Sequence, residues 1–408
     1  MISVEEHRAT VAELLTPGRT ATLPLAGCAG LVLAHDVRAG VSLPPFDNSA
    51  MDGFAVRSVD VVEATEDKPV ELPVTGDIPA GRTDVEPLLP GTAHRIMTGA
   101  PLPPGADSVV MVERTDAGPG FAGGDAGRVR VFATAPPGTH VRRTGEDVSA
   151  GTVALPAGSV LGPPQLGLAA AVGLDRLTVY TPPRVLVVST GSELVTAPDP
   201  LRHGQIYESN SIMLLAALRA LGCEVRTLRS VADDVGTFRE AVTAELAGVD
   251  LVVTSGGVSA GAYEVVKDAL ADAGVRFTKV AMQPGGPQGC GRWEGVPVVT
   301  LPGNPVSVLV SFEVFLRPAI LAAMGHTATS RQRVRARLTE DLRSPVGKRQ
   351  FRRGWYSPAV GAVTGEVGPR GGPGSHLLAA FAQANCLIEL PEEACEVVAG
   401  SEVDVILL

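Results

Sequence analysis

RVLVVSTGSEL, residues 184–194, decides the fold, because an uninterrupted apolar run ends there in a turn of small polar residues. DLVVTSGG (250–257) and VPVVTLPG (296–303) repeat the pattern further along the chain. Helical segments separate these runs, as in SNSIMLLAALRALG (209–222) and VGTFREAVTAELA (235–247). Apolar strands that alternate with helices predict a parallel sheet covered by helices on both faces.

The loops that follow the three strands are candidates for a ligand site. Ligands of open parallel sheets bind beyond the carboxyl ends of the strands, where small residues let backbone N–H groups approach an anion. The predicted binding residues are Thr190, Gly191, Ser192, Ser255, Gly256, Gly257, Ser259, Pro302, Gly303, Asn304 and Ser307. Turn chemistry alone is the alternative, because tight turns use glycine routinely. No G-x-x-x-x-G-K-[ST] motif occurs, so the chain is not a P-loop enzyme.

Carboxylates accompany these loops. Glu193 lies in the first loop, Asp233 follows the next strand, and Glu264 comes just after the SGGVSAG loop. Because the carboxyl ends of parallel strands meet at one edge, we expect these side chains to converge. Carboxylate oxygens suit Mg²⁺, so the pattern predicts a magnesium site. Helix capping is the alternative, and we favour it for Glu264 taken alone.

The composition excludes several classes of protein. The 408 residues include 34 basic and 44 acidic ones, and a net charge of −10 argues against a general nucleic-acid coat. No run of 18 apolar residues occurs, so we expect no membrane-spanning segment. The N-terminus has no basic or apolar leader, and the five cysteines form no C-x-x-C pair. We therefore expect reduced thiols and a cytoplasmic protein.

The remaining segments are rich in short strands. Ser3 with Glu6 predicts a capping box at the start of an N-terminal helix. Between residues 46 and 140, short apolar runs alternate with Pro/Gly turns, which predicts a small β domain. From about residue 330, runs such as SEVDVILL predict a C-terminal β-barrel or sandwich.

Three segments outside the sheet concentrate polar residues. PPFDNSAMDGFAVR (44–57) contains Asp52, HRIMTGAPLPPGAD (94–107) contains Thr98, and VRRTGEDVSAG (141–151) contains Asp147. Each segment taken singly fits ordinary turn chemistry, so a functional role stays open at this point.

Taken together, these motifs resemble those of the molybdopterin molybdenumtransferase family, the type of bacterial MoeA and the gephyrin E-domain. The matching stretches, in family order, are FDNSAMDGFAVR, RIMTGAPLPPGAD, VRRTGEDVSAG, STGSEL, SGGVSAG, LPGNPVS, QFRRG and GSHLL. The resemblance implies a multidomain α/β plus β protein. Its predicted parts are an elongated N-terminal domain (1–45 and 141–180), an inserted β domain (46–140), a three-layer α/β molybdopterin-binding domain (181–327) and a C-terminal β-barrel (328–408).

The resemblance also implies a reaction. Adenylylated molybdopterin and molybdate react, with Mg²⁺, to give molybdenum cofactor and AMP, in a cleft shared between the subunits of a homodimer. Implied catalytic residues are Asp52, Thr98, Asp147, Glu193 and Lys279. Lys267 matches a family lysine, and Arg353 and Ser375 match anion-binding positions of the family. The implied metal ligands are Asp233, Glu264 and Glu193. Other proteins of cofactor biosynthesis are candidate partners; nucleic acid and membrane are not.

One departure from the family pattern concerns the oxyanion. The family commonly has lysines in a K-P-G-K-P run where this chain has Gln283 and Gly286. Loss of these charges predicts weaker oxyanion binding, by about 1–3 kcal/mol for each charge-assisted bond removed. Two alternatives follow: a molybdopterin adenylyltransferase that shares the α/β domain, or a catalytically weak binding or scaffold protein.

Overall fold

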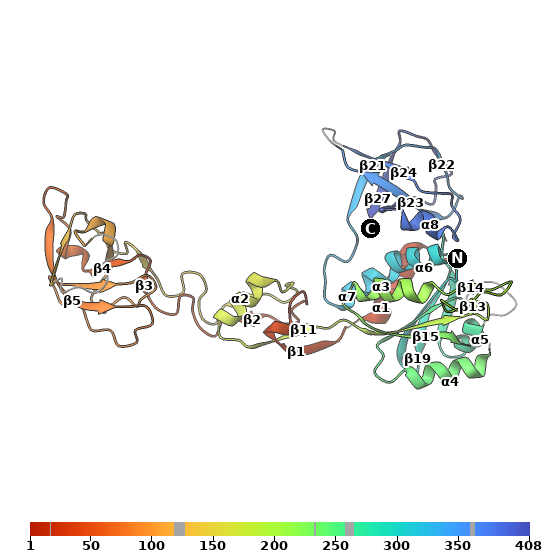
Figure 1. Ribbon diagram of the computed structural model, residues 1–408, viewed down its shortest axis with the longest axis horizontal. Helices are drawn as coiled ribbons and strands as arrows, with labels where there is room; N and C mark the ends of the chain where they lie inside the picture. Colours follow the sequence, from red (N-terminus) through yellow and green to blue (C-terminus); the bar gives the residue numbers. More distant parts are fainter. Residues whose placement is uncertain (17, 118–126, 232–233, 258–264, 360–363) are drawn as a thin grey trace. The chain divides into compact units, whose positions relative to one another are not determined.

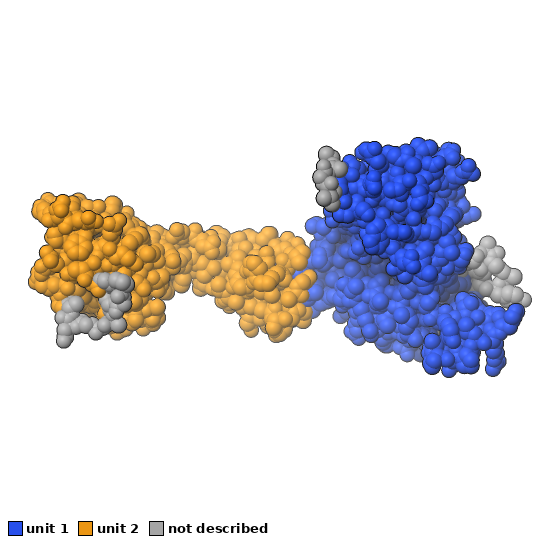
Figure 2. Space-filling model, turned by 45° about the horizontal axis from the view of Figure 1, so that its top comes forward, with its two compact units in different colours: residues 1–22, 31–34, 178–408 blue, residues 23–30, 35–177 orange. Residues whose placement is uncertain are grey.

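The structure, a computed structural model, describes residues 1–16, 18–117, 127–231, 234–257, 265–359 and 364–408. The chain divides into two compact units, coloured separately in Figure 2. Unit 1 consists of residues 1–22, 31–34 and 178–408, and unit 2 of residues 23–30 and 35–177.

The sheet of unit 1 has the strand order β15-β12-β16-β20-β19-β17. Its strands are β12 (Arg184–Thr190), β15 (Glu224–Val231), β16 (Leu251–Ser255), β17 (Val275–Lys279), β19 (Pro287–Trp293) and β20 (Val296–Leu301). Strands β15, β12, β16 and β20 are paired in parallel as predicted, but β19 runs antiparallel to both of its neighbours. The sequence predicted no strand at β19, where Gly289 and Gly291 interrupt the apolar pattern that marks the other strands, and this missed strand makes the sheet mixed.

Helices cover both faces of this sheet, as predicted. Figure 1 shows α4 (Val235–Glu245) and α5 (Val265–Ala271) on the face opposite α1 (Val4–Leu15), α3 (Asn210–Arg219), α6 (Pro305–Ser311) and α7 (Arg317–Ala323). The alternation of side chains along β12 builds both cores, because Val185 and Val187 pack with one set of helices and Leu186 and Val188 with the other. The predicted capping box at Ser3 and Glu6 opens α1.

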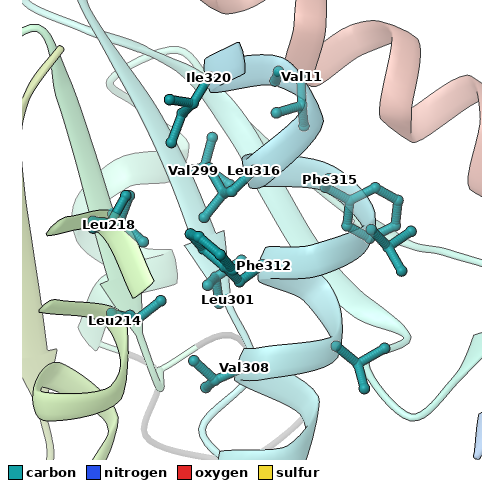
Figure 3. Packing of buried hydrophobic residues seen from close by; sticks show 14 of the residues in the cluster. Val11, Leu214, Leu218, Val299, Leu301, Val308, Phe312, Phe315, Leu316 and Ile320 are labelled. Carbon is teal, nitrogen blue, oxygen red and sulfur yellow. The ribbon is translucent and has the colours of Figure 1, made fainter. Parts of the chain in front are cut away.

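A long helix, Pro305–Ala323, runs through the first of these cores. A π-helical turn, η4 (Phe312–Leu316), joins α6 to α7. Pro318 has no backbone N–H, and the carbonyl of Val314 accepts a hydrogen bond from Nε of Arg8 instead (3.1 Å). The helix is long and apolar enough to cross a membrane, but 72% of its apolar window is buried in the protein, as in the core helix of a soluble domain. Figure 3 shows Phe312 and Leu316 among these core residues.

The C-terminal part forms the predicted β-barrel. Its strands are β21 (Arg333–Leu338), β23 (Arg349–Ser357), β24 (Gly365–Pro369), β25 (Cys386–Leu390) and β27 (Glu402–Leu407), and the ring closes because β23 pairs with both β24 and β25. Strand β18 (Met282–Gln283), which follows β17, joins this sheet beside β23. The helix α8 (Leu378–Ala382) and the pair β22 (Leu342–Arg343) with β26 (Glu396–Val397) complete this part.

Unit 2 contains the predicted small β domain. Its sheet has the order β7-β4-β6-β5-β8, formed by β4 (Gly53–Val56), β5 (Val70–Ile78), β6 (Ala93–Ile96), β7 (Ser108–Met111) and β8 (Arg128–Val131). Shorter pairs of this unit are β2 (Val37–Arg38) with β10 (Val153–Leu155) and β3 (Asn48–Ser49) with β9 (Val141–Arg142). Strand β1 (Thr20–Pro24) pairs with β11 (Arg176–Tyr180), and neither strand lies wholly within unit 2. The helix α2 (Pro163–Ala171) and the 3₁₀ turns η1 (Leu25–Gly27), η2 (Ser58–Asp60) and η3 (Val112–Arg114) connect them.

The predicted domain boundaries place α1 in the N-terminal domain, whereas the helix packs in the core of unit 1. The four boundaries themselves stay a prediction.

Candidate functional site

A cavity of about 710 Å³ opens at the carboxyl ends of β12, β16 and β20. The three predicted loops line it with Thr190–Glu193, Ser255–Gly257 and Gly303–Asn304. The loops are in direct contact, since the N–H of Gly256 donates to the carbonyl of Leu301 (3.1 Å). The structure therefore brings together in this cavity the loop residues that the sequence singled out, apart from Pro302 and Ser307, which line a second cavity, and Ser259, which lies outside the described residues.

Gly191 shows why this turn needs glycine. Its φ is +145°, and a Cβ on it would lie 2.8 Å from Oε2 of Glu193. The missing side chain leaves room for the Glu193 carboxylate, which lines the cavity and is exposed.

A further wall of the cavity was not predicted. Strand β13 (Leu194–Val195) pairs with β14 (Ile206–Tyr207), and the segment from Ile206 to Asn210 lines the cavity. Glu208 holds this wall in place: its carboxylate accepts from Oγ of Ser189 (3.1 Å) and from N (2.8 Å) and Oγ (2.5 Å) of Ser211. A carboxylate at the N-terminus of α3 also interacts favourably with the helix dipole. A glutamate between a short strand and a helix start was the available signal.

Asn210 links this wall to the loop after β20. Its Nδ2 donates to the carbonyl of Gly303 (2.7 Å). Its buried Oδ1 has no hydrogen-bond partner. The buried Oγ of Ser255 also lacks a partner. Both residues line the cavity, although these two atoms are themselves buried.

A second cavity, of about 430 Å³, adjoins the first. Gly303 and Asn304 line both cavities. The second is assembled from three distant segments, and its lining residues are Gln283–Gly285, Pro287, Pro302–Asn304, Ser307 and Pro373–His376. The predicted anion-binding residues Ser307 and Ser375 both lie here, together with Gln283. His376 was not predicted, although it lies in the quoted GSHLL motif.

Arg353 is placed behind the second cavity. It is 1% exposed, and its guanidinium donates to the carbonyls of Gly372 and Gly374 (3.2 Å to the latter). Arg352, also buried, donates to the carbonyl of Gly371 (3.2 Å). Burial, followed by the charge of Arg352, lowers the pKa of Arg353. Arg353 therefore holds the turn that carries Ser375 and does not itself line the cavity.

The two predicted lysines lie apart from both cavity linings. Lys267 is exposed on α5, and its backbone N–H donates to the carbonyl of Gly257 (3.2 Å). Lys279 is exposed at the end of β17, opposite Pro287 of the second cavity wall.

In unit 2, the structure brings the three polar segments together. The N–H of Gly99 donates to the carbonyl of Ser49 (2.8 Å), and that of Ala50 to the carbonyl of His140 (2.8 Å). Asp52 accepts from N and Oγ1 of Thr98, both at 2.7 Å. These bonds, from the backbone first, hold the pKa of Asp52 below its ordinary value.

Asp147 is exposed, and its backbone N–H donates to the carbonyl of Leu43 (2.9 Å). Its neighbours Arg143 and Thr144 both bond the carboxylate of Asp47 (2.7 Å each from Nη1 and from N). Asp52, Thr98 and Asp147 thus lie on segments joined by hydrogen bonds, and all three side chains are exposed to solvent.

The predicted magnesium ligands are only partly described. Asp233 and Glu264 lie outside the described residues. Among the residues that the structure does describe, no group of three His, Cys, Asp or Glu side chains could hold a metal ion. Glu193 faces the first cavity, while the oxygens of Glu208 are committed to serine donors.

Comparison with known proteins decides the family. Family models match along the chain: MoeA N-terminal region (domain I and II) at residues 2–173, probable molybdopterin binding domain at 186–322, and MoeA C-terminal region (domain IV) at 335–408. Molybdopterin molybdenumtransferase 2 of Mycobacterium tuberculosis is 53% identical over 412 residues, covering 99% of both chains. The chain belongs to the MoeA family of molybdopterin molybdenumtransferases. The predicted resemblance is confirmed.

Solved MoeA structures agree in fold. Two structures of the molybdopterin biosynthesis MoeA protein from Pyrococcus horikoshii match with TM-scores of 0.84 and 0.78, at 31% and 28% identity, over 100% of this chain. Molybdopterin molybdenumtransferase 1 of Mycobacterium tuberculosis is 38% identical over 429 residues. Full-length matches to transferases of this family place the chain among enzymes of molybdenum cofactor biosynthesis and do not favour the adenylyltransferase or scaffold alternatives.

Proposed function

We propose that the chain inserts molybdate into adenylylated molybdopterin, releasing AMP and forming molybdenum cofactor. The observation that carries this proposal is the pair of cavities that share the turn at Gly303 and Asn304. A two-substrate reaction needs two sites in contact, one large and one small. The first cavity takes the adenylylated pterin, and the second takes the tetrahedral oxyanion.

The first cavity has the size and chemistry for the larger substrate. Its volume falls within the range of about 300–1,000 Å³ that is typical of ligand sites. Small residues at three strand ends present backbone N–H groups to the phosphates.

Magnesium forms part of the proposal. An anionic phosphoanhydride beside the exposed carboxylate of Glu193 requires a cation to offset the repulsion. Asp233 and Glu264 are the other proposed ligands, on the sequence argument alone. The bound ion supplies neutralisation of the phosphates. Asp233→Asn keeps the shape of the side chain and removes its charge, so it should slow AMP release and alter the dependence of that rate on magnesium. An unchanged rate and magnesium dependence would contradict Asp233 as a metal ligand.

The assembly is proposed to be a homodimer in the cytoplasm, with other proteins of cofactor biosynthesis as candidate partners. Asp52, Thr98 and Asp147 then act on the cleft of a second copy. Mixing Asp52→Ala chains with Asp233→Ala chains should recover activity. In each mixed dimer, one of the two sites combines the intact Asp233 of one subunit with the intact Asp52 of the other. Activity that stays absent after proven subunit exchange would contradict shared sites.

Stoichiometric AMP release tests the function itself. Adenylylated molybdopterin is incubated with the chain, with and without molybdate, and AMP and cofactor are quantified. We expect AMP and molybdenum cofactor in equal amounts, and Ser307→Ala should raise the molybdate concentration required. AMP release without cofactor would contradict the proposal, and synthesis of adenylylated molybdopterin from ATP would favour the adenylyltransferase.

A further inference from the structure

The described lining of the second cavity contains no carboxylate, lysine or arginine side chain. Among its described lining residues, the polar side chains are those of Gln283, Asn304, Ser307, Ser375 and His376, and no lysine or arginine is present. An oxyanion bound here depends on hydrogen-bond donors held in position. The orientation of an amide then matters, because its nitrogen donates to an anion and its oxygen repels it.

Gln350 controls the amide of Gln283. The two residues are register partners in the parallel pairing of β18 with β23, so their side chains lie next to each other. Nε2 of Gln350 donates to Oε1 of Gln283 over 2.7 Å. This bond engages the oxygen of Gln283, which belongs to the cavity lining, and leaves the NH₂ group of that amide unengaged by Gln350. Gln350 is 1% exposed, so it does not reorient freely.

The backbone around Gln283 is fixed as well. The buried Gln288 donates from Nε2 to the carbonyl of Gly285 and to Oγ of Ser311, both over 2.7 Å. Gly285 has φ +97°, and a Cβ on it would lie 2.9 Å from the same Ser311 oxygen. The turn that follows Gln283 is therefore held against the helix α6, and the amide has little freedom to move away.

We infer that Gln350 is a positioning residue that turns the amide nitrogen of Gln283 toward the oxyanion. A fixed neutral donor thereby stands in a wall whose described lining contains no lysine or arginine. The inference rests on the proposed function, because it assumes that molybdate occupies the second cavity. It explains how this cavity retains an oxyanion without a lysine in its wall.

Molybdate binding to the whole chain, measured by titration calorimetry with sodium molybdate alone, tests the inference. In Gln350→Glu the carboxylate can only accept, so Gln283 must donate to it and present its oxygen to the cavity. We expect affinity to fall about tenfold or more, which corresponds to about 1.4 kcal/mol. The matched control is Gln332→Glu, which adds the same charge at an exposed position and should leave the affinity unchanged.

A rescue variant sharpens the test. In Gln283→Lys/Gln350→Glu, the new carboxylate pairs with a lysine that carries its own charge to the cavity, and affinity should return to at least the wild-type value. If Gln350→Glu fails to fold, as judged by circular dichroism, Gln350→Met removes the bond without adding a charge and should weaken binding several-fold.

The outcomes separate the two proposals. A wild-type chain that takes up no molybdate would contradict the oxyanion site itself and with it the inference. A wild-type chain that binds molybdate, with equal affinity in the folded Gln350 variants, would overturn the positioning role and leave the proposed function standing.

Discussion

The two cavities that meet at Gly303 and Asn304 are built in different ways. The first lies at the edge of one sheet, and its loops follow three consecutive parallel strands. The second is assembled from the turn after β18, the start of α6 and a turn held by the C-terminal barrel. The first combines the backbone groups and small residues of its three loops with the wall held by Glu208, whereas the second depends on side chains positioned by buried neighbours.

The difference separates general binding from selectivity. A strand-end cavity of small residues is a property of the fold, and its backbone donors suit many anionic ligands. The second cavity is set by particular side chains behind its wall, such as Arg353 and Gln350. Substitutions that affect one cavity and spare the other therefore test this division.

The largest effect should come from the core that supports both cavities. Phe312 is 2% exposed and follows α6, whose start forms the wall common to the two cavities. Phe312→Ala should lower the free energy of unfolding by about 4 kcal/mol, because it leaves a cavity in the core. Urea unfolding followed by circular dichroism measures it. Exposed Phe46→Ala is the control, and a loss below about 1 kcal/mol would show that the core repacks.

Arg353→Ala should affect only the second cavity. It removes the donors that hold the carbonyls of Gly372 and Gly374, and hydrogen bonds to charged groups contribute about 1.5–3 kcal/mol each. We expect molybdate affinity to fall roughly a hundredfold while AMP binding stays near the wild-type value. Arg353→Lys keeps the charge but not the planar fork, so its molybdate affinity should lie between those of the wild type and Arg353→Ala. Equal loss of AMP and molybdate binding would mean that the cavities are not separable.

The sequence predicted the first cavity better than the second for a physical reason. Apolar runs that end in STGSEL, SGG and LPGN mark strand ends, and the sheet brings strand ends together. The resemblance implied that Arg353 binds the anion, but the residue is buried behind the wall of the second cavity, and that placement depends on how the barrel packs. Gln350 acts through a partner 67 positions away in the sequence, which no local pattern marks. Glu208 was missed although its place between a short strand and a helix start is a local signal.

The same reasoning accounts for the missed strand. β19 is neither uniformly apolar nor followed by a helix, so only its pairing with β20 identifies it. Asp52 and Thr98 are 46 positions apart in the sequence, and hydrogen bonds join them in the structure. Unlike β19, both residues could be singled out beforehand, because each lies in a motif that carries the family resemblance.

Glu208→Gln should affect only the first cavity. The amide keeps the shape of the carboxylate but puts an NH₂ group where Ser189 and Ser211 donate. Losing one charge-assisted bond costs about 2 kcal/mol, so AMP affinity should fall roughly thirtyfold as the start of α3 loosens. Molybdate binding to the same sample serves as the internal control. Unchanged AMP affinity would show that this wall does not contribute to nucleotide binding.

Gly286→Lys should strengthen the second cavity by returning a charge that the family commonly has. Gly286 has no positive φ, and a Cβ on it would lie 3.4 Å from the carbonyl oxygen of Val280, so a lysine fits at modest cost. Gly286 is not itself a lining residue, but it lies between Gly285 and Pro287, which are, so an ammonium group here adds positive charge next to that wall. We expect the molybdate concentration for half-maximal cofactor formation to fall about tenfold, or about 1.4 kcal/mol.

Salt dependence distinguishes this gain from a general effect of charge. Binding through a lysine should weaken more steeply between low and high ionic strength than binding through neutral donors, because salt screens the added charge. Gly295→Lys, at a turn outside the second cavity, adds the same charge as a control, although its φ of +82° makes some loss of stability expected there. If Gly286→Lys changes neither affinity nor salt dependence, the oxyanion does not approach this wall, and the neutral donors of the second cavity do not replace the family lysines.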